Sequence, residues 1–155
     1  MIQNVKKILA PVDFSEASME AMRAAMEIAK DVDAEVHLMH VIAPHRTFIP
    51  LPLESNAEQT RELAREAAMV QQAEEEMARI RKDEFGDSNR VHTYAVVGHP
   101  VQKLIDYAKE QTIDLIVVAT RGRSGVELML GGGTTERLTR VAPCSVLVFH
   151  PRGKS

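Results

Sequence analysis

The sequence is poor in the residues on which several common kinds of protein depend. A single cysteine, Cys144, rules out a disulfide within the chain, and one thiol is typical of a protein kept in a reducing compartment. Tryptophan is absent and aromatic residues make up only 4%, which disfavours a surface on which nucleic-acid bases stack. Positive charge is not in excess, since the net charge is −3. Nucleic-acid binding as the main activity is therefore disfavoured.

Long hydrophobic runs are missing as well. No apolar stretch approaches the roughly 20 residues that cross a bilayer, and the opening residues MIQNVKK contain no signal-peptide core. We therefore expect a cytoplasmic protein without membrane insertion. The 155 residues predict one domain, 1–155, that ends in a short polar tail, 151–155. Hydrophobic residues reach 45% and charged residues 26%, which is typical of a globular domain with a sizeable core.

Short apolar runs alternate with helical periodicity along the chain. Each of these runs fits a strand buried on both faces, and they occupy residues 8–12, 35–42, 91–97, 114–119 and 145–149. Between them, apolar residues recur at three- and four-residue spacing, which predicts helices after Ser15, toward Glu84, from Pro100 and from Thr134. Strands that alternate with helices form right-handed β-α-β units. We predict an α/β fold, a doubly wound open parallel sheet with helices on both faces.

Two strand ends carry residues that suit a ligand. In an open α/β sheet, ligands bind beyond the carboxyl ends of the strands, where the winding reverses. The first strand ends in Pro11-Val12-Asp13, and a glycine-rich stretch, Gly122 to Gly133, follows the fourth. Glycines allow the backbone to approach an anion closely, and the helix that opens after Gly133 adds its free N–H groups. A flexible loop followed by a helix cap would explain the same glycines, so both interpretations stay open.

Several motifs resemble those of the universal stress protein family, in order over nearly the whole chain. They are ILAPVDFS at 8–15, GRSG at 122–125, GGTTER at 132–137 and APCSVLV at 142–148. The resemblance implies strand order 3-2-1-4-5 and a homodimer formed through the edge strand 145–149. It also implies a stress-response regulator that binds ATP, ADP or AMP, with Mg²⁺ as a companion ion, and that acts on an unidentified protein partner.

The nucleotide motif of that family, G-x2-G-x9-G followed by Ser or Thr, is present with two departures. Gly122 and Gly132 keep the nine-residue spacing, but Ala119 replaces the first glycine and Gly133 stands where the hydroxyl belongs. One lost hydrogen bond to a charged group costs about 1.5–3 kcal/mol, or about one to two decades of affinity. Thr134 is the neighbouring hydroxyl that can partly replace it. We expect an ATP site that is weak or that favours another adenine nucleotide.

The resemblance also implies roles for single residues. Asp13, with Pro11 and Val12, would contact the ribose or the base, although Asp13 can instead act only as a helix cap. Val41 would read the adenine edge through its backbone. Val118 and Ala119 would line the pocket. The predicted sugar and phosphate contacts are Gly122, Arg123, Gly132, Gly133, Thr134 and Thr135; Arg123 can also be plain surface.

Other chemistry has less support in the sequence. The six histidines show no spacing typical of zinc, and His37 and His40 have opposite parity on a strand, so they should face opposite sides of the sheet. We expect no metal site and no catalytic residue. Two alternatives to a nucleotide-dependent switch remain open. One is a slow ATP hydrolase, for which no general base is evident, and the other is a protein-interaction module that binds no nucleotide.

Overall fold

A parallel sheet of five strands organises the chain. The computed structural model describes residues 4–44, 56–120 and 133–152. The strands lie in the order β3-β2-β1-β4-β5, and every neighbouring pair is parallel. This order and this architecture confirm the prediction. The strands are β1 (Lys7–Pro11), β2 (Glu35–Ile42), β3 (Val91–Val97), β4 (Leu115–Ala119) and β5 (Ser145–Phe149).

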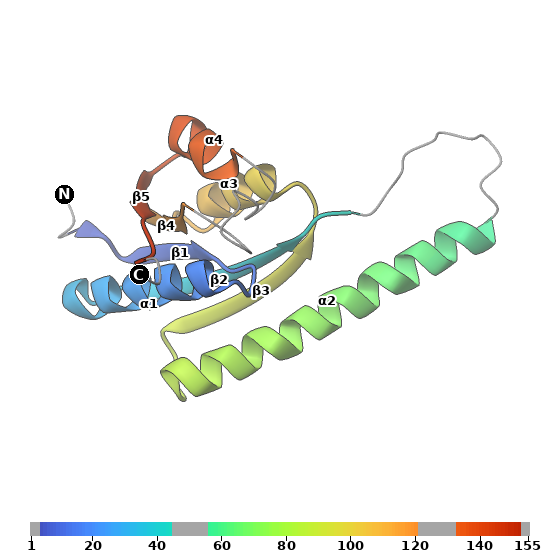
Figure 1. Ribbon diagram of the computed structural model, residues 1–155, viewed down its shortest axis with the longest axis horizontal. Helices are drawn as coiled ribbons and strands as arrows, with labels where there is room; N and C mark the ends of the chain where they lie inside the picture. Colours follow the sequence, from blue (N-terminus) through green and yellow to red (C-terminus); the bar gives the residue numbers. More distant parts are fainter. Residues whose placement is uncertain (1–3, 45–55, 121–132, 153–155) are drawn as a thin grey trace.

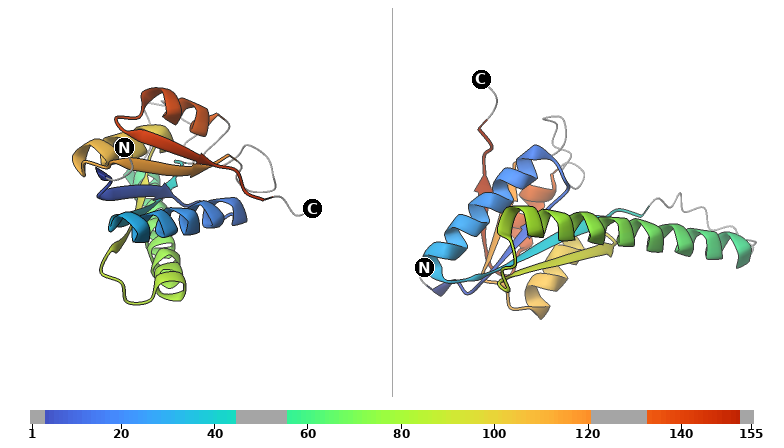
Figure 2. Two further views of the ribbon diagram at one scale, coloured as in Figure 1. Left: turned by 90° about the vertical axis from the view of Figure 1, so that its left-hand side faces the viewer. Right: turned by 90° about the horizontal axis from the view of Figure 1, so that it is seen from below.

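The helices of the described residues cover both faces of this sheet. On one face lie α1 (Glu16–Val32) and α2 (Asn56–Phe85), and on the other lie α3 (Pro100–Glu110) and α4 (Thr134–Val141) (Figure 1). The two turned views show the same layers from the side and from below (Figure 2). Among the described residues, none of these helices combines the length and the apolar character that a membrane crossing requires.

The central strands are buried on both faces because their successive side chains enter different cores. Ile8 and Ala10 of β1 pack with α1 and α2, whereas Leu9 packs with α3 and α4. All three side chains are fully buried, and each large aliphatic side chain removed from water contributes about 1.5–3 kcal/mol. A strand with two buried faces therefore appears in the sequence as a continuous apolar run rather than as an alternating one.

Helix α2 extends beyond the sheet that it covers (Figure 1). Its carboxyl-terminal half is anchored by the buried side chains of Ala73, Met77 and Ile80. Its amino-terminal half is solvated, and Leu63 there is 60% exposed. The long, mostly solvated helix predicted from the charges is therefore present, and its contribution to the core comes mainly from its second half.

Strand β5 forms one edge of the sheet. The N–H of Thr120 donates to the carbonyl of Phe149 at 3.0 Å, so Phe149 directs its backbone groups toward β4. Consecutive residues of a parallel strand bond to opposite sides. The backbone groups of Val146 and Val148 therefore point away from β4, to an edge that no other described strand covers.

Candidate functional site

Strands β1 and β4 stop pairing before they end. Their register includes only Ile8 with Leu115 and Leu9 with Ile116. The chain winds outward from β1 to β3 and then crosses back to β4, so the direction of winding reverses between these two strands. We call the carboxyl ends of β1 and β4 the switch point. Sheets of this kind bind ligands at such a position.

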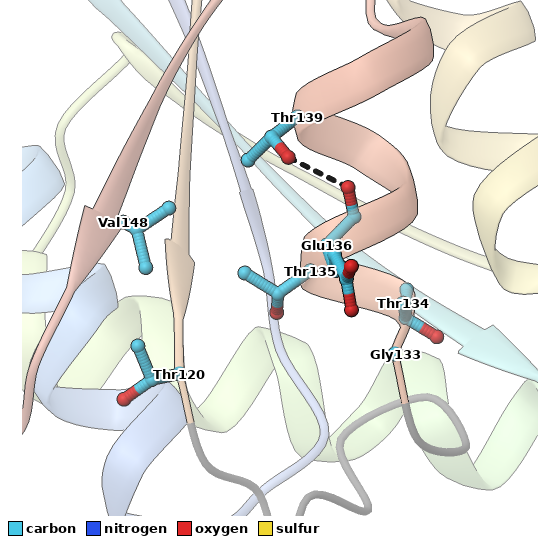
Figure 3. A pocket seen from close by; sticks show the side chains of 7 residues that line it. All are labelled: Thr120, Gly133, Thr134, Thr135, Glu136, Thr139 and Val148. Carbon is cyan, nitrogen blue, oxygen red and sulfur yellow. Dashed lines mark hydrogen bonds between the residues drawn. The ribbon is translucent and has the colours of Figure 1, made fainter.

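A hollow of about 270 Å³ lies at the amino end of α4, beside the ends of β4 and β5 (Figure 3). It is lined by Thr120, Gly133, Thr134, Thr135, Glu136, Thr139 and Val148. The first bond inside α4 runs from the N–H of Arg137 to the carbonyl of Gly133 at 2.8 Å. The N–H groups of Thr135 and Glu136 therefore have no partner within the helix. These amides and the positive end of the helix dipole favour an anion at this place.

The hydroxyl groups around the hollow differ in what they can do. Thr135 donates its hydroxyl proton to the carbonyl of Ala119 at 3.0 Å, and a threonine has only one such proton. Thr134 is only 3% exposed. Thr139 donates to the carbonyl of Glu136 at 2.6 Å. Two of the four threonine hydroxyl protons at the hollow, those of Thr135 and Thr139, are therefore committed to the protein. The backbone amides of α4 offer further donors for an anion.

Glu136 is the only acidic side chain that lines the hollow among the described residues. It accepts from the guanidinium of Arg140 at 3.0 Å, and both side chains are about 70% exposed. A carboxylate in the first turn stabilises a helix. The same negative charge opposes a highly charged phosphate group that enters the hollow.

Asp13 shapes the turn from β1 into α1. One oxygen of its carboxylate accepts from the N–H of Ser15 at 2.9 Å and also from the Ser15 hydroxyl. The Ser15 hydroxyl in turn accepts from the N–H of Ser18 at 3.1 Å and caps α1. Phe14, between Asp13 and Ser15, adopts a left-handed conformation with φ of 67°, which costs a non-glycine residue about 1–2 kcal/mol. Asp13 is therefore not the helix cap that we considered, because Ser15 caps α1 and Asp13 orders the turn before it. The second carboxylate oxygen of Asp13 accepts no hydrogen bond from a described residue.

The end of β2 also faces the switch point. The N–H of Val12 donates to the carbonyl of Met39 at 2.8 Å, so the backbone groups of Met39 and Val41 point to the same side. The last pair of the β1–β2 register is Pro11 with Met39, two residues before Val41. The next acceptor on the β1 side, the carbonyl of Val12, lies 2.7 Å from Nδ1 of His40. The backbone of Val41 is thus directed to the switch point, as its predicted role requires.

The described residues of the predicted site come from four separate elements. Pro11, Val12, Val118 and Ala119 are buried at the ends of β1 and β4. Asp13 and Val41 lie at the same edge of the sheet, and Gly133, Thr134 and Thr135 border the hollow. The remaining predicted contacts, Gly122, Arg123 and Gly132, lie outside the described residues.

Sequence reasoning missed four residues that line the hollow and one beside Val12. Thr120 directly follows β4, so the rule that ligands bind beyond strand ends applies to it. Thr139 lies four residues after Thr135, one turn along the same face of α4. Glu136 belongs to the family motif and Val148 to the predicted edge strand, and neither position by itself indicates a ligand contact. The sequence shows His40 as a possible metal ligand but does not show that it lies beside the carbonyl of Val12.

Comparison with known proteins identifies the family. The family described as "Universal stress protein family" matches residues 4–150. The chain belongs to this family. A curated relative, the universal stress protein MJ0531 of Methanocaldococcus jannaschii, is 36% identical over 145 residues, which cover 92% of this chain and 81% of the relative.

Solved structures of other universal stress proteins have the same fold. UspA from Lactobacillus plantarum is 28% identical, with a TM-score of 0.76 over 94% of this chain and 97% of its own. Two more distant structures are described as nucleotide complexes. A universal stress protein in complex with cAMP is 21% identical, with a TM-score of 0.60 over 96% of this chain and 99% of its own. A family protein from Arabidopsis thaliana with AMP bound is 16% identical, with a TM-score of 0.56 over 96% and 93%.

Proposed function

We propose that this universal stress protein binds an adenine nucleotide at the switch point and acts as a dimeric, nucleotide-dependent switch in the stress response. The observation that carries the proposal is the hollow at the amino end of α4, where amide groups face the ends of β4 and β5. The adenosine would lie toward Asp13 and the backbone of Val41, and the phosphates toward α4. The relatives that hold cAMP and AMP support an adenine nucleotide as the ligand class.

The site favours a nucleotide of low charge. Gly133 provides no hydroxyl, and the hydroxyl of Thr135 is engaged with Ala119. Glu136 adds a negative charge at the hollow. AMP or a cyclic monophosphate needs fewer donors than ATP and is repelled less by this carboxylate. We therefore expect AMP or cAMP to bind more tightly than ATP, unless Mg²⁺ neutralises part of the triphosphate.

Titration calorimetry of the nucleotide-free protein tests this proposal. ATP, ADP, AMP and cAMP are titrated with and without Mg²⁺ into the wild type, Glu136→Gln and the control Glu110→Gln. Glu110 ends α3, is exposed, and lines no part of the hollow. If the phosphates lie at α4, Glu136→Gln should increase the affinity for ATP by up to about fivefold, an amount typical of one exposed charge contact. AMP should gain less, and Glu110→Gln should match the wild type.

The result against the proposal is no heat with any of the four nucleotides and no nucleotide released from the purified protein. That result would favour a protein-interaction module, the second candidate. The observation that favours such a module is the solvated amino-terminal half of α2, where the large apolar side chain of Leu63 is 60% exposed. Hydrolysis has weaker support, because Glu136 is the only carboxylate among the described residues lining the hollow and it pairs with Arg140.

A further inference from the structure

Three side chains with metal-ligand chemistry meet at the edge of the sheet opposite the switch point. Glu35 and His37 are two residues apart on β2, so their side chains lie on the same face. His92 of β3 pairs directly with His37 in the β2–β3 register. All three lie near the amino ends of these strands, on the face that α3 covers. The inference drawn from them does not depend on nucleotide binding.

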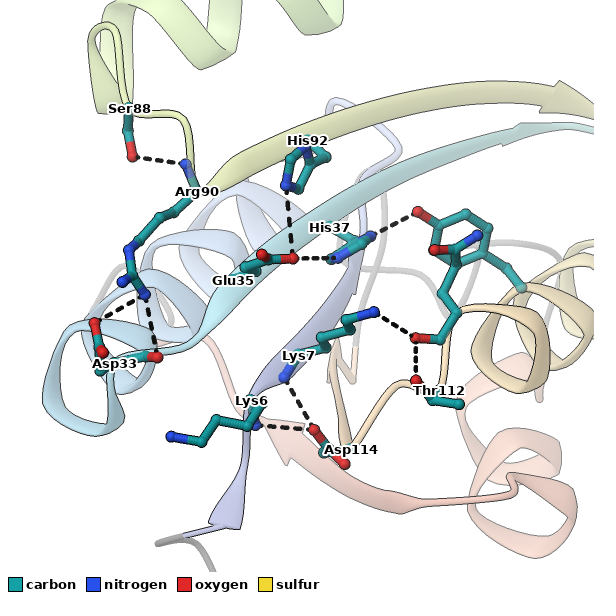
Figure 4. A network of polar contacts seen from close by, with 12 residues as sticks. Lys6, Lys7, Asp33, Glu35, His37, Ser88, Arg90, His92, Thr112 and Asp114 are labelled. Atoms are coloured by element: carbon teal, nitrogen blue, oxygen red, sulfur yellow. Dashed lines mark hydrogen bonds and ion pairs between the residues drawn. The ribbon is translucent and has the colours of Figure 1, made fainter.

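The distances among these side chains are short (Figure 4). One oxygen of Glu35, Oε2, lies 3.5 Å from Nε2 of His37 and 3.7 Å from Nε2 of His92. One ligand atom from each of the three residues lies within 4.8 Å of the others. The two imidazole rings are tilted against each other, with their centroids 5.0 Å apart. Two imidazole nitrogens therefore lie within 3.7 Å of one carboxylate oxygen.

His37 presents a buried nitrogen to this space. The residue is only 3% exposed, and its Nε2 has no partner in hydrogen-bonding geometry among the described residues. Buried polar atoms are nearly always hydrogen-bonded, and each exception calls for an explanation such as a missing ion or water. The Nε2 atom is aimed at the carboxylate of Glu35, which supplies no hydrogen bond to it in this geometry.

The other nitrogen of His37 is held by a residue of α3. Its Nδ1 lies 2.6 Å from the hydroxyl of Tyr107. Tyr107 is itself buried and packs against the ring of Tyr94, which holds its hydroxyl in place. A histidine that binds a metal through one nitrogen usually has its other nitrogen fixed by such a partner.

We propose that Glu35, His37 and His92 bind a divalent transition-metal cation of the zinc class. Two imidazoles and a carboxylate are ligands that Zn²⁺ accepts, and bonds of about 2.0–2.2 Å in a tetrahedral site separate neighbouring ligand atoms by roughly 3.4 Å. The two measured separations from Glu35, 3.5 Å and 3.7 Å, come within a few tenths of an ångström of that value. The proposal departs from the expectation of no metal site.

The surroundings leave an entry path and an open coordination position. The side chains of Glu35 and His92 are 44% and 38% exposed, so an ion can reach the site from solvent and retain water as a fourth ligand. One positively charged side chain, that of Lys7, lies beside these three residues (Figure 4). Its ammonium donates to the carbonyl of Gln111 at 3.1 Å, which fixes it on the α3 side of the network (Figure 4).

The test uses the metal alone, on the full chain without a histidine tag and free of nucleotide. Zn²⁺ and Co²⁺ are titrated by calorimetry into the wild type, Glu35→Gln, His92→Gln and the control His99→Gln. His99 is exposed and belongs to the opposite end of β3. Glu35 and His92 are partly exposed, so their glutamine variants should fold, and circular dichroism verifies this. Mg²⁺ serves as a second control, because it prefers oxygen ligands in an octahedral shell.

We expect one Zn²⁺ per chain, with affinity at least about tenfold lower in Glu35→Gln and in His92→Gln. His99→Gln should equal the wild type, and Mg²⁺ should give no signal at this site. Co²⁺ should show the intense visible absorption of a tetrahedral complex, and this band should disappear in His92→Gln. The proposal is overturned if Zn²⁺ does not bind the wild type, or if folded His92→Gln binds it with unchanged affinity. Because no nucleotide is present, neither outcome affects the proposal for the switch point.

Discussion

The hydroxyl of Thr135 lies 3.0 Å from the carbonyl oxygen of Ala119, and this bond joins the first turn of α4 to the last residue of β4. The register between β1 and β4 ends at Leu9 with Ile116, so no strand on the β1 side pairs with this carbonyl in the recorded register. A side chain therefore replaces the missing bond of the sheet. The same bond fixes the position of the α4 amide groups relative to the switch point.

Thr135→Val should lower both the stability of the fold and the affinity for a nucleotide. The valine keeps the shape but leaves the carbonyl of Ala119 unpaired, which should lower the free energy of unfolding by about 1–2 kcal/mol. Because the amino end of α4 is then less well positioned, nucleotide affinity should fall by up to about tenfold. Urea denaturation and calorimetry measure the two quantities. Thr112→Val is the control, since the Thr112 hydroxyl donates to the carbonyl of Gln111 and Thr112 does not line the hollow, and equal losses of affinity in both variants would count against the proposed phosphate position.

Gly133 precedes α4 with φ of 78°, a left-handed conformation. A Cβ atom there would have no neighbour within 4 Å, so the backbone alone decides the effect of a substitution. Gly133→Ala should cost about 1 kcal/mol or somewhat more, and Gly133→Asn less, because asparagine tolerates this conformation better. Gly86→Ala is a matched control, since Gly86 has φ of 63° and equally open space. Thermal unfolding should show similar losses for both alanine variants, and only Gly133→Ala should alter nucleotide binding.

The guanidinium of Arg23 on α1 holds the carboxylate of Glu84 at the end of α2 through two hydrogen bonds, of 2.9 and 3.1 Å. A two-point contact is the favourable geometry for an exposed pair, so a double-mutant cycle should give a coupling of about 0.5–1 kcal/mol. The cycle combines Arg23→Gln with Glu84→Gln and is measured by urea denaturation. Glu76→Gln, which removes a single exposed contact to Arg79 within α2, should cost less. A coupling near zero would mean that packing alone attaches α2.

The same pair predicts a pH dependence. The hydrogen bond from Arg23 lowers the pKa of Glu84, so the pKa of this carboxyl is lower in the folded than in the unfolded chain. The stabilisation that the ionised Glu84 gives to the fold is fully present above the ordinary pKa of the carboxyl, about 4.3. It is lost as the pH falls through the pKa of Glu84 in the folded chain. The difference in unfolding free energy between the wild type and Glu84→Gln should therefore be present at pH 7 and shrink as the pH falls below about 4.3. A difference that stays constant over this range would contradict the assignment.

The positions of the helices and strands along the sequence were predictable because each depends on a local pattern. The apolar runs 91–97 and 145–149 coincide with β3 and β5, and the apolar face of Val101, Leu104, Ile105 and Ala108 is buried as expected. The predicted strand 8–12 lies one residue further along the chain than β1, which spans Lys7–Pro11. The strand order came from the resemblance to the family, since periodicity identifies strands but does not order them.

The contacts between distant residues were not predictable in this way. Parity correctly placed His37 and His40 on opposite faces: His37 lies against Tyr107 of α3, and the ring of His40 lies 4.5 Å from that of Phe14. Parity does not tell which residue of a neighbouring strand lies opposite, because that register is set by packing of the whole sheet. The pairing of His37 with His92 therefore emerged only from the structure.

The free edge of β5 yields the last prediction, which concerns the proposed dimer. The N–H of Val146 points away from β4, so Val146→Pro removes an outward donor and leaves the β4–β5 bonds intact. Proline is tolerated on the outer side of an edge strand. If two copies pair through β5, this variant should be a folded monomer in sedimentation velocity, where the wild type is a dimer. Leu147→Pro is the contrasting variant, because its N–H points to β4 and its loss should destabilise the fold itself. A dimer that persists in folded Val146→Pro would place the interface on another surface.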